Sequence, residues 1–218
     1  MYFASRMQAG RMLSARLKDK YRYENCAIMS IDDGGVMVGA QIAVDLHCVL
    51  TLMTSAEIKL PLEPTAVAGI TGTGALAYNS QYAKGELDDM LSENRGYFEQ
   101  EKLRSMHELN HMLGHMGTID KRLLRGHNII VVSEGVKSAF EIDMAYEFLK
   151  PIMIEKLIFA VPFASVSAVD RMHVLGDELV CLDVLEDYIG TNHYYDDNDI
   201  PSHSTIVDAL ENIMLNWR

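Results

Sequence analysis

The amino-acid sequence predicts an α/β protein with one mainly parallel, twisted sheet and helices on both of its faces. The first observation is a series of short apolar runs typical of buried strands, at residues 27–31, 49–53, 129–132, 157–161 and 179–182. The second is that segments with the apolar spacing of helices lie between and around these runs. Strands that alternate with helices pair in parallel and bury both faces of their sheet. A chain of 218 residues can bury one full core, so we expect a single domain over residues 1–218.

The first part of the chain is predicted to fold as helix, strand, helix and strand. Apolar residues recur at roughly helical spacing over residues 3–18, with basic residues between them; they are Phe3, Met7, Met12, Leu13 and Leu17. The strand at 27–31 is followed by a turn at Asp32-Asp-Gly-Gly35 and by a helix over 36–46. The strand at 49–53 closes this part.

The middle of the chain is predicted to form a β-hairpin followed by a helical insertion. Pro61, Pro64 and a series of glycines mark a bent region. The run Gly69-Ile-Thr-Gly-Thr-Gly74 could cradle a phosphate, but the Lys-Ser/Thr pair of a P-loop does not follow it. We therefore favour a β-hairpin that forms a small hood region beside the main sheet. Residues 80–124 are charged and helical in character, and they separate the first strands from the strand at 129–132.

Residues 125–149 read as strand, tight turn and helix, with charged groups at the turn. Ligands of open α/β sheets bind at such turns, and the N–H groups at a helix N-terminus suit an anion. Here the chain supplies its own anion, because Ser138 and Glu141 match a capping box in which the Glu141 carboxylate reaches back to the start of the helix. Beyond the strands at 157–161 and 179–182, we expect a last helix near 205–215.

Charge and composition exclude several classes of partner. The 19 basic and 31 acidic side chains give a net charge of -12, which opposes nonspecific binding to nucleic acid or to anionic membranes. No apolar run approaches the roughly 20 residues of a membrane helix, and the N-terminus has no apolar signal core. The cysteines at 26, 48 and 181 form no pair with metal-binding spacing, so we expect reduced thiols. These observations predict a cytoplasmic protein with no nucleic-acid and no membrane partner.

The order of these units resembles the type I phosphoribosyltransferase family, in its broad phosphoribosyltransferase-like branch. The segments that carry the resemblance cover most of the chain; they are Phe3, Arg6, Ala9 and Gly10, then Gly34-Gly35-Val36, the hairpin from Ala68 to Asn79, Arg125-Gly126 before the strand at 129–132, Ala160-Val161-Pro162, and Gly190 to Tyr195. The order of the segments is more specific than any one of them. The resemblance implies a phosphoribosyltransferase-like fold and a homodimer.

The resemblance also implies a site for phosphoribosyl pyrophosphate, a phosphorylated sugar, at the turn after residues 129–132. In the family a pair of acids holds the ribose hydroxyls, and a loop of small residues binds the 5′-phosphate. By position, Ser133 and Glu134 match the acidic pair, which makes Glu134 the candidate catalytic residue. The remaining positions that match ligand-binding residues of the family are Gly135, Lys137, Ser138, Ala139 and Glu141 in the loop, and Asp32, Asp33, Gly34 and Gly35 near the first Gly-Gly.

An active enzyme of this family would use Mg²⁺, for which Glu134, Asp32 and Asp33 are the candidate ligands here, with Lys137 as an added cation. A purely structural interpretation stays open and is slightly favoured: Glu134 pairs with Lys137 in the turn, and Asp32 and Asp33 are solvated turn residues. A helix that Glu141 caps no longer requires a bound anion.

Two departures from the family pattern add negative charge to this site. Where the family usually has glycines and threonines around the phosphate, this chain has Ser138, Ala139, Phe140 and Glu141; where many relatives carry an arginine, it has Asp32-Asp33. We therefore expect a phosphoribosyltransferase-fold protein with a divergent donor site, weakly active or acting as a non-catalytic ligand-binding or regulatory protein for a nucleotide-like molecule. An active phosphoribosyltransferase that transfers the sugar to a base is the alternative.

A second motif permits a different function. His107-Glu-Leu-Asn-His111 matches HExxH, in which two histidines one helical turn apart bind Zn²⁺ and Glu108 activates a water molecule. The longer metzincin pattern requires a histidine at position 117, which is glycine, and His115 comes two residues too early. A zinc-dependent hydrolase through His107 and His111 is therefore the less favoured alternative, and Zn²⁺ is not the cofactor we expect.

Overall fold

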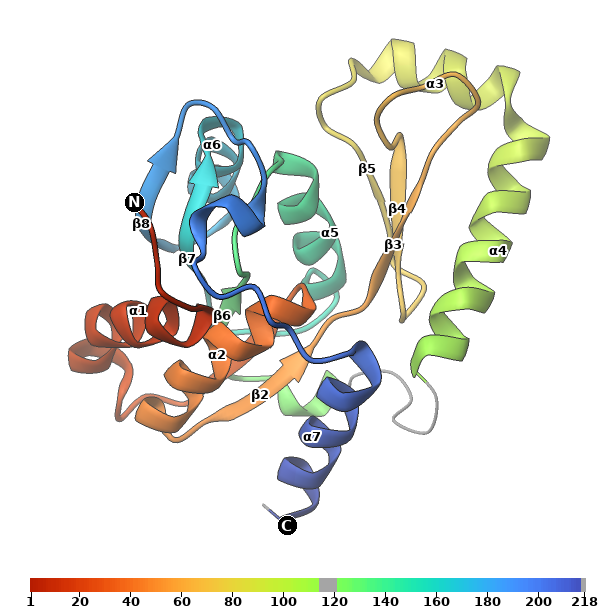
Figure 1. The fold of residues 1–218 in the computed structure, drawn as a ribbon. Coiled ribbons are helices and arrows are strands. Elements are labelled where there is room, and N and C mark those ends of the chain that lie inside the picture. The colour runs from red at the N-terminus through yellow and green to blue at the C-terminus, as the bar shows by residue number, and fades with distance from the viewer. Residues whose placement is uncertain (114–120, 217–218) are drawn as a thin grey trace.

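A five-stranded parallel sheet forms the centre of the protein, as the sequence predicts. The computed structural model describes residues 1–113 and 121–216 (Figure 1). The strands lie in the order β2-β1-β6-β7-β8, and every neighbouring pair is parallel. Their bounds are Val49–Leu52 for β2, Cys26–Ser30 for β1, Asn128–Val132 for β6, Lys156–Ser165 for β7 and Glu178–Leu185 for β8.

Helices cover both faces of this sheet because its strands are apolar on both sides. In β6, Ile129 and Val131 face one core cluster, and Ile130 and Val132 face the other. The first cluster is closed by α5 (Ala139–Leu149) and α6 (Val166–Leu175), and the second by α1 (Arg6–Tyr21), α2 (Asp33–Leu46) and α7 (His203–Asn216). The predicted fold class is therefore confirmed.

No helix of the described segments is long and apolar enough to cross a bilayer.

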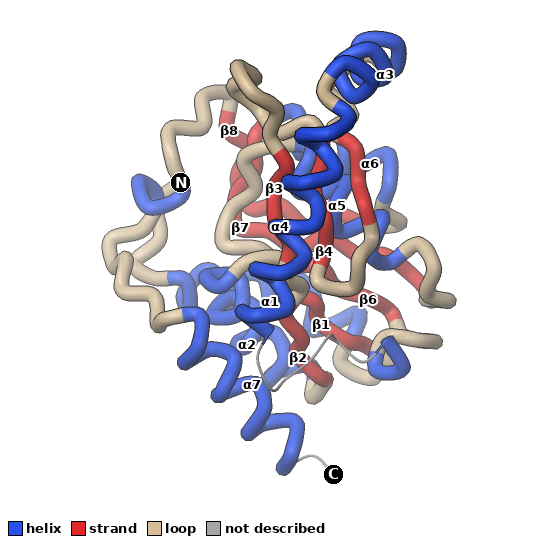
Figure 2. The backbone as a smooth tube through the Cα atoms, turned by 90° about the vertical axis from the view of Figure 1, so that its right-hand side faces the viewer, coloured by secondary structure: helices blue, strands red, loops and turns tan. Residues whose placement is uncertain are grey.

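A second, antiparallel sheet stands beside the main one and forms the hood, which we define as residues 55–113. Its strands are β3 (Ser55–Ile58), β4 (Ala68–Thr71) and β5 (Leu76–Tyr78), in that order. The hairpin predicted from the glycine series is β4-β5, whereas β3 was not expected. Helices α3 (Lys84–Glu93) and α4 (Arg95–Leu113) pack on this sheet through one apolar cluster (Figures 1 and 2); its buried members are Ile58, Leu60, Val67, Ala68, Ile70, Leu87, Phe98 and Leu109.

The other face of the hood sheet rests on α5. Gly69 of β4 lies so close to Phe140 and Met144 that any side chain there would overlap them. The N–H of Ser80, just after β5, approaches the buried carboxylate of Asp143 at 3.4 Å. Helix α5 therefore packs both against the main sheet and against the hood. These contacts fix the position of α5 relative to the antiparallel strands.

The predicted starts of the first two helices are wrong, each for a local reason. The first helix begins at Arg6 with Ser5 as its N-cap, so Phe3 lies outside it and instead pairs with Tyr195 in an isolated bridge. The expected turn at 32–35 is the cap and first turn of α2, because Asp32 accepts a hydrogen bond from the Gly35 N–H. Two short 3-10 helices, at Lys121–Leu123 and Thr191–Tyr194, complete the described elements.

Candidate functional site

Three carboxylates gather where β1 and β6 end at the carboxyl edge of the sheet. Asp32 follows β1, Glu134 follows β6, and Glu141 lies in the first turn of α5. Burial, followed by the charge of Glu134, raises the pKa of Asp32 to about 6. Burial, followed by the charge of Asp32, raises the pKa of Glu141 to about 7. Three acidic side chains therefore lie close together at the edge where open sheets bind ligands. Because their pKa values are raised, part of the Asp32 and Glu141 carboxyl groups stays protonated near neutral pH.

Asp32 is a partly buried helix cap and not a solvated turn residue. Its Oδ1 accepts hydrogen bonds from the N–H of Gly35 at 2.5 Å and from the N–H of Glu134 at 3.3 Å. Asp33 is also engaged, because its carboxylate lies 2.8 Å from Nδ1 of His203 at the start of α7. The structural interpretation offered for these two acids is therefore wrong: each stabilises a junction between elements.

Glu134 pairs with Arg6 and not with Lys137, which corrects the turn salt bridge expected from the sequence. The Arg6 Nε donates to Oε2 of Glu134, and the Arg6 side chain is 1% exposed against 18% for Glu134. The other guanidinium nitrogens donate to Asn192 Oδ1 at 2.8 Å, to the Asp197 carbonyl at 3.2 Å and to Asn198 Oδ1 at 3.4 Å. Arg6 therefore ties α1 to the acid at the end of β6.

Tyr195 holds the backbone of the same acid. Its hydroxyl donates to the Glu134 carbonyl at 2.5 Å, and its ring lies 4.5 Å from the Arg6 guanidinium carbon. Gly34 leaves the space in which the Arg6–Glu134 pair sits, because a Cβ at this position would overlap both side chains. Glu134 is thus fixed through its carboxylate, its carbonyl and its N–H at once.

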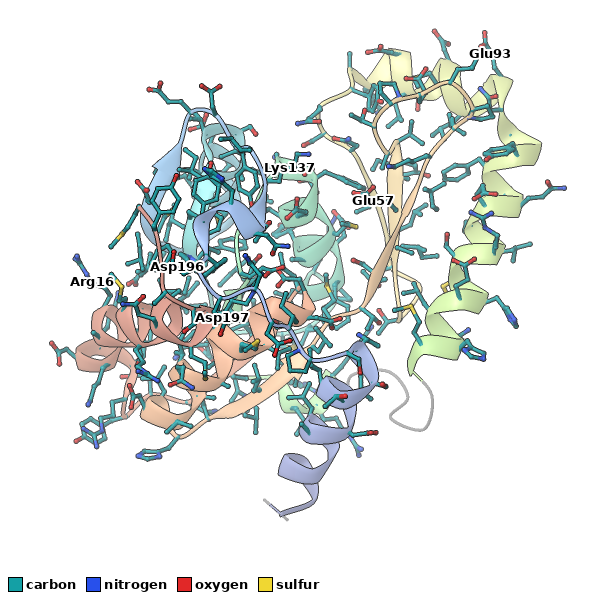
Figure 3. All side chains as sticks on the ribbon, in the orientation of Figure 1. Arg16, Glu57, Glu93, Lys137, Asp196 and Asp197 are labelled. Atoms are coloured by element: carbon teal, nitrogen blue, oxygen red, sulfur yellow. The ribbon has the colours of Figure 1, made fainter. Side chains whose placement is uncertain are left out.

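The loop after Glu134 runs alongside β7. The N–H of Val136 donates to the Phe163 carbonyl at 3.1 Å, and the Ser165 N–H donates to the Val136 carbonyl at 2.9 Å. The buried Ser133 hydroxyl accepts from the Gly135 N–H at 3.1 Å. Lys137 is exposed, and Figure 3 shows its side chain extending from the core toward the hood.

Glu141 occupies the start of α5. Ser138 and Glu141 form the predicted capping box, with Oε1 of Glu141 accepting from the Ser138 N–H at 3.2 Å and lying 3.3 Å from the Ser138 hydroxyl. Ala139 and Phe140 are buried in the core cluster on this face of the sheet. An anion approaching the start of α5 would therefore meet a carboxylate that already accepts the Ser138 N–H.

Solved structures with a similar fold exist for this architecture. No protein-family model matches the sequence. The crystal structure of TT1426 from Thermus thermophilus superposes with a TM-score of 0.74 at 23% identity, over 97% of this chain and 99% of that one. The chain has a phosphoribosyltransferase-like fold.

Two further likenesses are weaker. A hypothetical protein from Neisseria gonorrhoeae with bound ppGpp gives a TM-score of 0.49 at 14% identity, over 96% of each chain. A purine phosphoribosyltransferase from Pyrococcus horikoshii gives 0.46 at 10% identity, over 89% of each chain.

Within the phosphoribosyltransferase-like fold, the residues expected at the donor site do lie around one edge of the sheet. They comprise Asp32, Gly34, Gly35, Ser133, Glu134, Gly135, Ser138 and Glu141. The HExxH motif lies elsewhere: His107 and His111 are exposed on α4, and Glu108 pairs with Arg104 at 3.6 Å. His115 lies outside the described residues.

The sequence placed Arg6 and Tyr195 in segments that carry the resemblance, but it did not predict their contacts with Glu134. A signal for Arg6 was present, since it shares the helical stripe of Ala9, Gly10 and Leu13, all of which are buried in α1. A charged side chain on a buried face requires a partner of opposite charge. The tyrosine pair at 194–195 follows β8 and is also buried.

The residues present do not fit the Mg²⁺ that the fold implies. Among residues 1–113 and 121–216, no group of three or more His, Cys, Asp or Glu side chains could hold a metal ion. Ser133 stands where the family has an acid, and the remaining acid, Glu134, is neutralised by Arg6. Mg²⁺ usually keeps several waters and binds through one or two free carboxylates together with the phosphates of a ligand. Here Asp32 caps α2, Asp33 lies against His203 and Glu134 pairs with Arg6, so each candidate carboxylate is already engaged. No step of the proposed function therefore uses a metal bound by these acids.

Proposed function

We propose that this protein binds a nucleotide-like small molecule or a phosphorylated sugar at the carboxyl edge of its main sheet, with phosphoribosyl transfer weakened or lost. The observation that carries this proposal is the Glu141 carboxylate on the N–H of Ser138. In the phosphoribosyltransferases that the sequence resembles, this loop receives the 5′-phosphate. The homodimer implied by the resemblance belongs to the same proposal and is testable by sedimentation.

The magnitude of the charge effect supports weakened donor binding. Two unit charges about 4 Å apart repel by about 4 kcal/mol at an effective dielectric constant of about 20. A phosphate at the start of α5 would face this repulsion from Glu141, with Asp32 as a second acid nearby. About 1.4 kcal/mol corresponds to a tenfold change in affinity, so ionised Glu141 is sufficient to remove most phosphate binding.

Protonation moderates this penalty. With a pKa of about 7, Glu141 is ionised in only part of the molecules near neutral pH. The protonated acid carries no repulsive charge, so a phosphorylated ligand still binds a fraction of the protein. Exposed Lys137, three residues after Glu134, supplies a cation on the same loop. Weak, pH-dependent binding is therefore the expected behaviour, and it fits a ligand-binding role better than rapid turnover.

The experiment is isothermal titration of the protein with phosphoribosyl pyrophosphate, with and without Mg²⁺, combined with an assay for pyrophosphate release in the presence of purine and pyrimidine bases. We expect dissociation constants well above the micromolar range at pH 8 and no release above background. Micromolar binding with pyrophosphate release would establish the alternative, an active phosphoribosyltransferase, and would overturn the proposal.

A further inference from the structure

A buried cation stands beside the acid that would otherwise require a counterion from solution. The Arg6 guanidinium is 1% exposed and lies against the Glu134 carboxylate. Its remaining nitrogens donate to Asn192, Asn198 and the Asp197 carbonyl, and its central carbon lies over the Tyr195 ring. All of these partners belong to the protein, so the guanidinium is held in place, and Glu134 is the acid with which it forms an ion pair.

This arrangement changes the charge that a divalent ion would encounter. The Arg6–Glu134 pair has no net charge, and a cation approaching Glu134 would be repelled by the guanidinium at contact distance. Asp32 uses Oδ1 to cap α2 and accepts from the N–H groups of Gly35 and Glu134, so this oxygen is already engaged. Asp33 is paired with His203. The three acids expected to hold Mg²⁺ are each engaged by the protein.

We propose that Arg6 is a permanent counterion for Glu134, and that this edge binds its ligand without a divalent cation. The proposal rests on the proposed function only for the location of the ligand. Arg6 here supplies the neutralisation that a metal ion supplies at an acidic site, and it does so from the first helix of the chain. Arg6 is thus a positioning residue: it acts on the ligand through Glu134.

The first test needs no ligand. Mn²⁺ is titrated into the protein and free Mn²⁺ is followed by electron paramagnetic resonance. Wild-type protein and Glu134→Gln are expected to bind Mn²⁺ equally weakly, whereas Arg6→Gln is expected to gain at least tenfold in affinity because the partly exposed Glu134 carboxylate is then an uncompensated charge. Arg6→Lys, which keeps the cation, is the matched control and should gain little.

The gain must also depend on Glu134, so the double variant Arg6→Gln/Glu134→Gln should return to the wild-type affinity. A wild-type Mn²⁺ site that disappears in Glu134→Gln would overturn the proposal, and so would a folded Arg6→Gln protein without any gain. Circular dichroism establishes which variants are folded. If Arg6→Gln does not fold, the comparison of wild type with Glu134→Gln decides the question alone.

The second test uses ribose 5-phosphate, which carries one phosphate and no pyrophosphate to chelate the ion. Its affinity for the wild-type protein should agree within twofold in Mg²⁺ and in EDTA. A loss of tenfold or more in EDTA would overturn the proposal. Absence of ribose 5-phosphate binding in both buffers would instead count against the proposed function, and the Mn²⁺ titration would still decide the role of Arg6.

Discussion

The Glu141 carboxylate lies 3.2 Å from the Ser138 backbone nitrogen and accepts its hydrogen bond. Ser138 ends the loop that follows β6, and Glu141 lies in the first turn of α5, so the contact closes the start of this helix with a charge from the same chain. A helix N-terminus satisfied in this way gains stability from its own side chain and loses its attraction for external anions. Stability and ligand binding are therefore coupled through one carboxyl group.

Glu141→Gln should change how stability depends on pH. The folded-state pKa of Glu141, about 7, lies above its ordinary value of 4.5, and that of Asp32 is raised in the same direction. As the pH rises, the unfolded chain loses these protons at a lower pH than the folded protein does. The contribution of the two protonated carboxyl groups to the free energy of unfolding is therefore complete below about pH 4.5 and is lost as the pH rises through 7. We expect the free energy of unfolding to fall by on the order of 2 kcal/mol between pH 5 and pH 8.

Urea unfolding at several pH values measures this trend. The Glu141→Gln variant should show a clearly shallower decline over the same range, since Asp32 alone remains to titrate. Substitution of the exposed Glu24 by Gln serves as the control and should follow the wild-type curve. Parallel curves for wild type and Glu141→Gln would show that Glu141 ionises normally in the folded protein.

Gly34→Ala should destabilise the protein although alanine favours helices. A Cβ at position 34 would overlap the Glu134 carboxylate and the Arg6 guanidinium, and overpacking of this kind costs about 1–3 kcal/mol. Gly85 in α3 is the matched control, because a Cβ there has no neighbour within 4 Å, and Gly85→Ala should be neutral or stabilising by up to about 1 kcal/mol. Thermal unfolding of both variants measures the difference. Equal effects at the two positions would contradict the close packing around Glu134.

The exposed histidines of α4 should not carry a functional metal. His107 and His111 lie at the surface, and Glu108 is engaged by Arg104. Elemental analysis of untagged protein is expected to give substoichiometric zinc, and His107→Ala and His111→Ala should unfold at the wild-type temperature. Stoichiometric zinc that is lost in His107→Ala would restore the hydrolase alternative.

The fold was largely predictable because its signals are local and periodic. The run 129–132 is apolar on successive residues, as a strand buried on both faces requires, and β6 pairs on both sides with parallel neighbours. Helix α5 begins at Ala139, just after its predicted cap. Helix α6 escaped prediction because it follows directly from β7 at Ser165, with no intervening turn signal.

The site was less predictable because its partners are far apart in the sequence. Arg6 and Glu134 are separated by 128 positions, so no local spacing joins them, and the nearest cation in sequence, Lys137, was the natural but wrong partner. The contact of Tyr195 with the Glu134 carbonyl spans 61 positions and has no local signal either. Capping contacts, in contrast, span three residues, which is why the contact of Glu141 with Ser138 could be predicted.

The most direct test of the occupied helix start is the affinity of phosphoribosyl pyrophosphate for wild type and Glu141→Gln at pH 8 and pH 6. Glutamine keeps the size of the side chain and removes its charge. At pH 8, where roughly one wild-type molecule in ten carries protonated Glu141, the variant should bind about tenfold more tightly, and at pH 6, where most of the wild-type Glu141 is protonated, the two affinities should agree within about twofold. Equal affinities at pH 8 would contradict the account, because they would show that the Glu141 carboxylate does not compete with the phosphate.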